Sequence, residues 1–338
     1  MATTDAAAVA APRLVAVGAG RMGRGIAIAF AWAGHRIAVV DLKRRSADAW
    51  HALRADARAE IDASLRSLAE LGAIDPARID AIAARIDFID AAGAPAALAA
   101  AQLVFEGVPE RLDAKREAFA RLGAECSGEA ILTSTTSSIL VSELAAFVPR
   151  PERFLNMHWL NPAYVIPVVE LSTHPATSPA TLATTKALLE AIGKVPIVCG
   201  PTPGYIVPRL QALVMNEAAR MVEEGAATAA EIDKATRFGL GLRFAALGVV
   251  EFIDVGGVDI LHHASREMAA SVDAARYAAP AIVGAHMAAN HLGLKTGSGF
   301  YDYAGRDLAA YRRDVLARTL AMVQRAGLWR GAVDETLA

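Results

Sequence analysis

Up to residue 200, hydrophobic residues gather in short runs that alternate with stretches of helical periodicity. The first apolar run, 13–17, leads into GAGRMGRGIAIAFAWAG, a helical pattern that stops at Gly34, and a second run, RIAVVD, follows at 36–41. A strand, a helix and a strand within about 30 residues indicate a βαβ unit with a right-handed crossover. Residues 44–84 predict two helices around the turn in AELGAIDPARIDAI.

Six further apolar runs predict strands, and helical patterns fill most of the gaps between the earlier ones. This alternation predicts an α/β fold, with an N-terminal Rossmann-type, doubly wound and mostly parallel sheet. The six runs are ARIDFI, AQLVFEGV, EAILTST, RFLNMHWL, VIPVVEL and VPIVCG.

The pattern changes after CGPTPG, where helical periodicity takes over. From Ile206 to Glu224 apolar residues recur at helical spacing, and Gly225 is a natural C-terminal stop. Further helices are predicted around 229–238, 247–270, 280–291 and 307–326. We therefore expect a flexible tail over 1–12, a dinucleotide-binding domain over 13–200, an all-helical domain over 201–326 and a tail over 327–338.

Composition and charge exclude several classes of protein. With 54% hydrophobic residues, a net charge of -2 and a pI near 6.5, the chain has material for a core but no basic face for nucleic acid. Its two cysteines, Cys126 and Cys199, make neither a disulfide framework nor a metal set. The start lacks the pattern of a signal peptide, and no apolar run approaches the about 20 residues of a membrane span. We expect a cytoplasmic protein without nucleic-acid, membrane or metal partners.

A cofactor site is predicted at the first βα turn. Gly18, Gly20 and Gly23 satisfy G-x-G-x-x-G between a strand and a helix, and Asp41 ends the next strand. In such a turn the glycines admit a pyrophosphate at the helix N-terminus, and the acidic residue accepts from a ribose 2′-hydroxyl. The basic run 43–45 argues for NADP. Because Asp41 occupies the fingerprint position, we predict NAD and interpret the run as the cap of a solvated helix start.

His158 and Glu170 occupy two consecutive apolar runs, in positions where a strand core would prefer valine. Burial of an unpaired charge is unfavourable, so the two groups are candidates for a pair. A carboxylate bound to one imidazole nitrogen fixes the tautomer and makes the other nitrogen a better base for a hydroxyl proton. The alternative is a core histidine satisfied by the backbone and a strand-edge glutamate in a salt bridge.

Several motifs, taken in order, resemble the 3-hydroxyacyl-CoA dehydrogenase family over roughly 13–325. They are VAVGAGRMGRGIA, LVFEGVPERLDAKREAF, TSTTSSI, HWLNP with VVEL, PGYIVPRL and GLKTGSGFYDY. The resemblance implies that His158 and Glu170 are the catalytic pair and that Ser137 binds the substrate hydroxyl. The residues alone indicate instead that Ser137 and Ser138 are N-caps of the helix ILVSELAAF, a role that stays open for Ser138.

The resemblance also implies further cofactor contacts and a homodimer formed by the second domain. From residue types alone, Glu110 beside a proline and Lys295 in a glycine-flanked loop would be interpreted as ordinary solvated surface residues. By resemblance, Glu110 and Lys115 lie near the nicotinamide ribose, Asn161 holds the carboxamide, Lys295 is a late contact and Met22 belongs to the cofactor turn.

Three departures from the family bear on the substrate. Pro208 stands where the family usually has an asparagine that helps to hold the substrate and the catalytic histidine. The helical stretch DASLRSLAELGAID keeps Ser64 and Arg66 but lacks later basic residues that would meet CoA phosphates. The stretch GLGLRFAALGVVEF differs from the family's usual version, which is rich in glycine and proline, and it carries Arg243. This stretch resembles the branch with lambda-crystallin (L-gulonate dehydrogenase) and carnitine dehydrogenases, which act on free hydroxy acids. Arg243 is either a carboxylate clamp or a surface or helix-capping arginine.

The predicted function is therefore interconversion of the 3-hydroxyl and 3-keto forms of a short-chain L-3-hydroxyacyl-CoA with NAD. Ser64 and Ser137 are the candidate substrate contacts, and such an enzyme belongs to fatty acid metabolism. The first alternative is a dehydrogenase of a free hydroxy acid, with Arg243 on the carboxylate. The second is a dinucleotide-binding protein with little catalysis, which the intact Ser137, His158 and Glu170 oppose.

Overall fold

The computed structural model describes residues 13–329, and the chain divides into two compact units between Val214 and Met215. This division falls inside one helix, α8 (Val207–Glu223). The tail expected over 1–12, and most of that expected over 327–338, lies outside the described residues.

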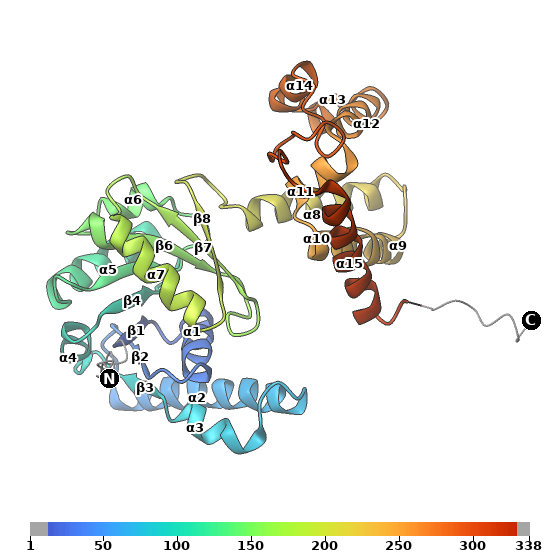
Figure 1. Cartoon of the computed structure of the whole chain (residues 1–338). Coiled ribbons are helices and arrows are strands. Elements are labelled where there is room, and N and C mark those ends of the chain that lie inside the picture. Colours follow the sequence, from blue (N-terminus) through green and yellow to red (C-terminus); the bar gives the residue numbers. More distant parts are fainter. Residues whose placement is uncertain (1–12, 330–338) are drawn as a thin grey trace, which may run out of the picture. The chain divides into compact units, whose positions relative to one another are not determined.

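An eight-stranded sheet forms the centre of the first unit, with the order β3-β2-β1-β4-β5-β6-β7-β8 (Figure 1). All neighbouring strands are parallel except β6 and β7, which are antiparallel. The doubly wound, mostly parallel sheet predicted from the sequence is confirmed. The strands are β1 (Leu14–Val17), β2 (Ile37–Val40), β3 (Ile86–Ile89), β4 (Leu103–Glu106), β5 (Ile131–Ser134), β6 (Phe154–Trp159), β7 (Val168–Thr173) and β8 (Val195–Cys199).

Helices connect these strands and cover both faces of the sheet. The two helices predicted over 44–84 are present on either side of the expected turn, and a glycine at 34 with φ 98° follows the first helix, as the sequence indicated. The helices are α1 (Arg21–Trp32), α2 (Ala47–Glu70), α3 (Ile79–Ala83), α4 (Ala94–Ala99), α5 (Leu112–Glu125), α6 (Val141–Ala145) and α7 (Pro179–Ala191), with 3₁₀ turns η1 (Pro76–Arg78) and η2 (Pro151–Arg153).

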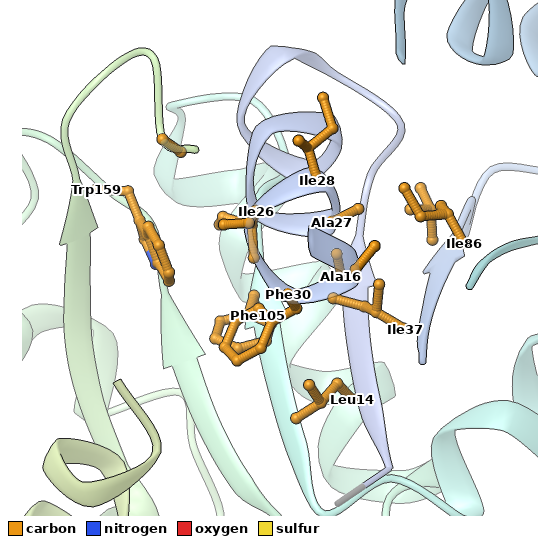
Figure 2. Close-up of a cluster of buried hydrophobic side chains, with 14 of the residues drawn as sticks. Leu14, Ala16, Ile26, Ala27, Ile28, Phe30, Ile37, Ile86, Phe105 and Trp159 are labelled. Atoms are coloured by element: carbon orange, nitrogen blue, oxygen red, sulfur yellow. The ribbon is translucent and has the colours of Figure 1, made fainter. Parts of the chain in front are cut away.

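Alternating side chains of each strand feed two separate cores, because successive residues of a strand point to opposite faces. On one face, Ala16 packs with Ile26 and Phe30 of α1, Phe105 of β4 and Trp159 of β6 (Figure 2). Buried residues of α2, α3 and α7 belong to the same core. The other face carries α4, α5 and α6.

The same alternation fixes the direction of the predicted catalytic pair. Met157 and Trp159 of β6 belong to the core with α1, whereas Phe154 belongs to the core with α5. His158 therefore points to the face that carries α4–α6. In the antiparallel register of β6 and β7, His158 lies directly opposite Glu170, so both side chains share that face.

The second unit is helical, as predicted, but two of its helices differ from the expectation. The stretch 247–270 is two helices, because Gly257 has φ 111° and lies between them. The helix expected over 229–238 passes into a π-helical segment from Ala235. Besides the last part of α8, the unit contains α9 (Ala229–Lys234), the π segment (Ala235–Gly241), α10 (Leu242–Ala246), α11 (Val249–Gly256), α12 (Val258–Ser271), α13 (Ala274–Tyr277), α14 (Ala281–Ala288) and α15 (Leu308–Arg325).

A buried carboxylate holds the loop GLKTGSGFYDY within this unit. Asp254 is fully buried; its Oδ1 accepts from the N–H of Phe300 at 3.0 Å, and its Oδ2 from the N–H of Tyr301 at 2.9 Å and the hydroxyl of Tyr303 at 3.2 Å. Backbone and hydroxyl donors on both oxygens stabilise the charge away from water. The loop is thus fixed to α11 by one side chain.

Candidate active site

His158 and Glu170 form a buried hydrogen-bonded pair. Nδ1 of His158 donates to Oε2 of Glu170 at 2.8 Å, since a carboxylate can only accept. Glu170 is fully buried, and His158 is 7% exposed. Within residues 13–329 no hydrogen bond is made by Nε2 of the imidazole. The arrangement leaves that nitrogen available as an acceptor, with its tautomer fixed by the carboxylate.

The second oxygen of Glu170 is anchored to the start of α8. Oε1 accepts from the backbone N–H groups of Ile206 at 2.9 Å and Val207 at 2.8 Å. These two backbone donors fix the position of the carboxylate beside His158. Pro208 is the second residue of α8, where a missing N–H leaves no hydrogen bond unmade, so the helix begins normally with a proline in its first turn.

Tyr205 completes the surroundings of the imidazole. Its ring is stacked on His158 with centroids 4.7 Å apart and an interplanar angle of 14°. Its hydroxyl donates to the carbonyl of Thr136 at 2.8 Å and accepts from the side-chain amide of Asn156 at 3.2 Å. Burial raises the pKa of Tyr205, so the phenol stays protonated at neutral pH. Nothing in the sequence pattern singles out Tyr205, although it lies in the PGYIVPRL motif.

Glu110 organises the loop that carries Ser137. Its Oε1 accepts from the backbone N–H of Ser137 at 2.9 Å, and from the N–H and hydroxyl of Ser138 at 3.0 and 2.9 Å. The prediction that Ser137 or Ser138 caps the next helix is wrong: α6 begins after Leu140 with no side-chain cap, because the Ser138 hydroxyl is bound to Glu110. Ser137 is exposed, and its hydroxyl is 3.5 Å from Glu110.

We expect the stability supplied by Glu110 to depend on pH. Burial opposes its ionisation, but the hydrogen bond from Thr136, the charge of Lys115 and the bonds from Ser138 outweigh this and lower its pKa to about 2. A carboxyl group whose pKa is lowered in the folded state stabilises the protein at pH values above its unfolded-state pKa. This stabilisation is lost as the pH falls toward the folded-state pKa.

The melting temperatures of the wild type and of Glu110→Gln, recorded between pH 3 and 7, test this expectation. The wild type should be the more stable by a constant margin above about pH 5, and the margin should shrink below about pH 4.5. A margin that does not change with pH would contradict the assignment.

Lys115, on α5, is buried inside the first unit, and its ammonium reaches the end of β4. It is 1% exposed, and its ammonium donates to both oxygens of Glu106 at 3.1 and 3.0 Å and lies 3.4 Å from Glu110. Glu106 is fully buried and also accepts from the hydroxyl of Ser134 at 2.6 Å. Glu106 was not singled out in the sequence, where it appears as one polar residue within the apolar run AQLVFEGV.

The glycines of the predicted cofactor turn fit a dinucleotide. Gly18 has φ 96°, and a Cβ there would lie 3.0 Å from the carbonyl oxygen of Gly107; a Cβ on Gly23 would lie 2.0 Å from that of Gly18. A Cβ on Gly20 meets no atom within 4 Å. Packing therefore accounts for two of these glycines, and the third faces open space, as the approach of a pyrophosphate requires.

The turn also lies where ligands bind in doubly wound sheets. β1 has β2 on one side and β4 on the other, and it is here that the strand order reverses. Met22, in the first turn of α1, is half-buried and packs against the hydrophobic core of that face. Asp41 follows β2 and is 8% exposed, at the position that a ribose-binding carboxylate needs.

The interpretation of the basic run 43–45 as a helix cap is wrong. The N-cap of α2 is Ser46, whose hydroxyl accepts from the N–H of Ala49 at 3.3 Å. Arg45 instead forms an ion pair with Asp41, because its side chain reaches back over the turn to the end of β2.

Asn161 lies in the loop between β6 and β7 and is exposed. It lines a cavity of about 220 Å³ together with Ser64 of α2 and Arg21 of α1. The hydroxyl of Ser64 donates to the carbonyl of Glu60 at 2.9 Å. Asn161 and Ser64, predicted to contact cofactor and substrate respectively, thus share one recess.

A buried lysine holds the β6–β7 loop in place. Nζ of Lys194 donates to the carbonyls of Ala163 at 2.7 Å and Ile166 at 2.9 Å, and burial lowers its pKa. The lysine is 8% exposed. Because this loop joins the strands of His158 and Glu170, Lys194 is a positioning residue for the site.

We expect Lys194→Met to lower the free energy of unfolding by about 1–3 kcal/mol, since two carbonyls lose their donor. Urea denaturation measures the change. Lys186→Met, on the preceding helix, removes a lysine without a described hydrogen bond and should cost about 0.5 kcal/mol or less. Equal effects of the two substitutions would show that the carbonyl contacts contribute nothing.

Two predicted site residues belong to the second unit. Nζ of Lys295 lies 2.8 Å from both oxygens of Asp259. Arg243, on α10, is exposed and lies over the ring of Phe252 at 5.7 Å, and the described residues include no carboxylate paired with it. Arg66, on α2 of the first unit, pairs with Asp62 at 2.7 Å.

The described residues contain two free cysteines and neither a metal-binding cluster nor a membrane-spanning helix. Cys126 and Cys199 are both free, and burial raises the pKa of each thiol, that of Cys126 to about 11. Residues 13–329 contain no group of three His, Cys, Asp or Glu side chains placed to hold a metal ion. None of the helices in that range has the length and apolar character to cross a bilayer.

Two family models match most of the chain. Residues 13–202 match the model described as 3-hydroxyacyl-CoA dehydrogenase, NAD binding domain, and residues 204–303 match that described as 3-hydroxyacyl-CoA dehydrogenase, C-terminal domain.

Individual relatives differ in the substrates that their names give. The chain is 30% identical to a 5-formyl-3-hydroxy-2-methylpyridine 4-carboxylate 5-dehydrogenase of Mesorhizobium japonicum, over 91% of this chain and 96% of that protein. It is 36% identical to a lambda-crystallin homolog of Bos taurus, over 74% and 76%. Its fold is similar to the crystal structure of a 3-hydroxyacyl-CoA dehydrogenase from Archaeoglobus fulgidus, with a TM-score of 0.72, 28% identity and coverage of 94% and 99%.

Proposed function

Because the chain belongs to the 3-hydroxyacyl-CoA dehydrogenase family and is an NAD-dependent oxidoreductase of secondary alcohols, we propose that its substrate is a short-chain L-3-hydroxyacyl-CoA, such as 3-hydroxybutyryl-CoA. The observation that carries the proposal is the pair formed by His158 and Glu170, with Nε2 of the imidazole left free. The family assignment favours an enzyme over the alternative of a dinucleotide-binding protein without catalysis.

In oxidation, Nε2 of His158 takes the proton of the substrate C3 hydroxyl, and in reduction it returns the proton to the keto oxygen. NAD, when bound, supplies the acceptor for the hydride that leaves the same carbon. Glu170 holds Nδ1–H and stabilises the imidazolium that forms after proton transfer. Tyr205 keeps the ring plane fixed by stacking, and Ser137 binds the substrate oxygen.

The residues described above fit NAD at named positions. The turn from Gly18 to Gly23 receives the pyrophosphate, and Asp41 accepts from the adenosine ribose. Glu110 and Asn161 are assigned to the nicotinamide end. Lys115, whose ammonium is held by Glu106, acts by placing Glu110.

The test is the rate of NADH formation with L-3-hydroxybutyryl-CoA, measured beside free L-3-hydroxybutyrate, L-gulonate and L-carnitine. A kcat/KM for the thioester about 100-fold or more above that of every free acid supports the proposal. Turnover of a free acid alone would overturn it.

A free hydroxy acid is the second candidate, and one observation favours it. Arg243 is exposed and has no carboxylate partner in the described part of the chain, so its guanidinium is open to bidentate contact with a substrate carboxylate. The relative from Mesorhizobium japonicum, whose alignment covers 91% of this chain, is named for a pyridine carboxylate substrate. If a free acid is turned over, Arg243→Ala should raise its KM with little change in kcat.

The protein is also proposed to be a homodimer. Apolar side chains on one face of α8 are exposed, among them Leu210 at 46%, Leu213 at 65% and Val214 at 45%. An exposed apolar row of this kind is a typical subunit contact. Light scattering after size-exclusion chromatography tests this assembly. A cytoplasmic location and a place in fatty acid metabolism remain predictions.

A further inference from the structure

The carboxylate expected to favour NAD over NADP is paired with an arginine in this structure. Oδ2 of Asp41 accepts from Nε of Arg45, and Oδ1 accepts from the backbone N–H of Lys43 at 3.2 Å. The side chains of Asp41 and Arg45 are 11% and 30% exposed. Because the guanidinium of Arg45 is hydrogen-bonded to the carboxylate of Asp41, it offsets the repulsion that this carboxylate exerts on a second anion nearby.

A cavity of about 790 Å³ adjoins this ion pair, and cations dominate its lining. The cations Lys43, Arg44 and Arg45 line it, together with His51, against one carboxylate, that of Asp90. Asp90 is already used within its own turn, where Oδ1 accepts from a backbone N–H at 2.9 Å. Arg45 both lines the cavity and touches Asp41, so the cavity lies next to the expected position of the adenosine ribose.

Little in the described part of the chain neutralises these cations. Lys43 and Arg44 are exposed and form no ion pair there. The turn leads into the N-terminus of α2, a helix of 24 residues, which adds a positive dipole end. Asp48, in the first turn of α2, is the carboxylate that the helix itself places near this end. Among the residues that line the cavity itself, three cations face the single carboxylate of Asp90, so the side-chain charge of the lining is positive.

We propose that Lys43, Arg44 and Arg45 form a phosphate-binding site that receives the 2′-phosphate of NADP, so that the protein binds NADP as well as NAD. A 2′-phosphate is attached to the ribose that Asp41 is placed to contact, and an arginine near that position accommodates it. Arg45 has the decisive place, because its guanidinium can contact the phosphate while it lowers the repulsion from Asp41. The inference concerns the cofactor and does not depend on which substrate is oxidised.

The test is equilibrium binding of NADPH and NADH to the full chain, followed by nucleotide fluorescence in the absence of substrate. Wild type is compared with Arg45→Ala, Arg44→Ala and a control, Arg66→Ala. Arg66 lies on α2 but outside the cavity, and it pairs with Asp62. Competition by adenosine 2′,5′-bisphosphate and 3′,5′-bisphosphate distinguishes the phosphate of NADP from that of CoA.

The expected Kd of wild type for NADPH is within about tenfold of that for NADH, and Arg45→Ala weakens NADPH binding about tenfold or more with less than about threefold change for NADH. Arg66→Ala should change neither. A wild-type Kd for NADPH beyond tenfold that of NADH, an equal loss of both nucleotides in Arg45→Ala, or stronger competition by the 3′,5′-bisphosphate would each overturn the inference. Since no turnover is measured, these outcomes are independent of the proposed substrate.

Discussion

Replacing His158 with asparagine is expected to lower kcat by about 10²–10⁴-fold, the contribution that a positioned general base makes to such a reaction. Nε2 of this imidazole is the basic atom that the buried pair leaves free, and asparagine has no group that takes a proton at neutral pH. NADH binding should stay within about threefold of wild type, since His158 lies outside the glycine-rich turn.

Two companion variants make this prediction sharper. His174→Asn alters a histidine whose Nδ1 accepts from the N–H of Ala176 in the loop after β7, and it should leave kcat unchanged. Glu170→Gln keeps the shape of the pair but removes the charge that stabilises imidazolium, so kcat should fall while NADH binding is retained. A loss below about tenfold in His158→Asn would exclude His158 as the base.

The substitution Glu106→Gln is expected to lower the free energy of unfolding by about 3–5 kcal/mol, because it leaves the buried charge of Lys115 without its ion-pair partner. Lys115 and Glu106 are 1% and 0% exposed, and their contacts at 3.0 and 3.1 Å replace water for both groups. With glutamine at 106, the one carboxylate left to the ammonium of Lys115 is that of Glu110, at 3.4 Å, beside the hydroxyl of Ser134 at 3.4 Å. Chemical denaturation at pH 7 measures the change.

The double variant Glu106→Gln, Lys115→Met is the control. Once both charges are gone no buried charge is left unpaired, so at least half of the lost stability should return. If the double variant is as unstable as the sum of its parts, the two residues act independently, and the buried pair does not explain their burial.

The sheet could be predicted from the sequence because each of its strands is an apolar run and most are separated by a helical pattern. The antiparallel step between β6 and β7 was not predicted, although the connection between the two strands is too short for a parallel crossover. The break at Gly257 was missed, because apolar spacing continues across it and a positive φ leaves no mark on hydrophobic periodicity.

The residues proposed to act on the substrate are easier to recognise in the sequence than those that hold them in place. His158 and Glu170 stood out because ionisable groups are rare inside apolar strands. Tyr205 and Lys194 did not, because each is an ordinary residue in a loop until the fold brings it against His158 or the carbonyls of another loop. Contacts of that kind depend on tertiary structure, which spacing in a single sequence does not contain.

The register of β6 against β7 also bears on how relatives of this protein can be found. His158 and Glu170 meet because they are opposite residues in two antiparallel strands, and the number of residues between them has no part in that contact. An insertion in the connecting loop keeps the pair, whereas a deletion of one residue within either strand turns one side chain to the other face. A search for further proteins with this pair should therefore allow any interval between histidine and glutamate, and require two adjoining strands whose alternation brings them face to face.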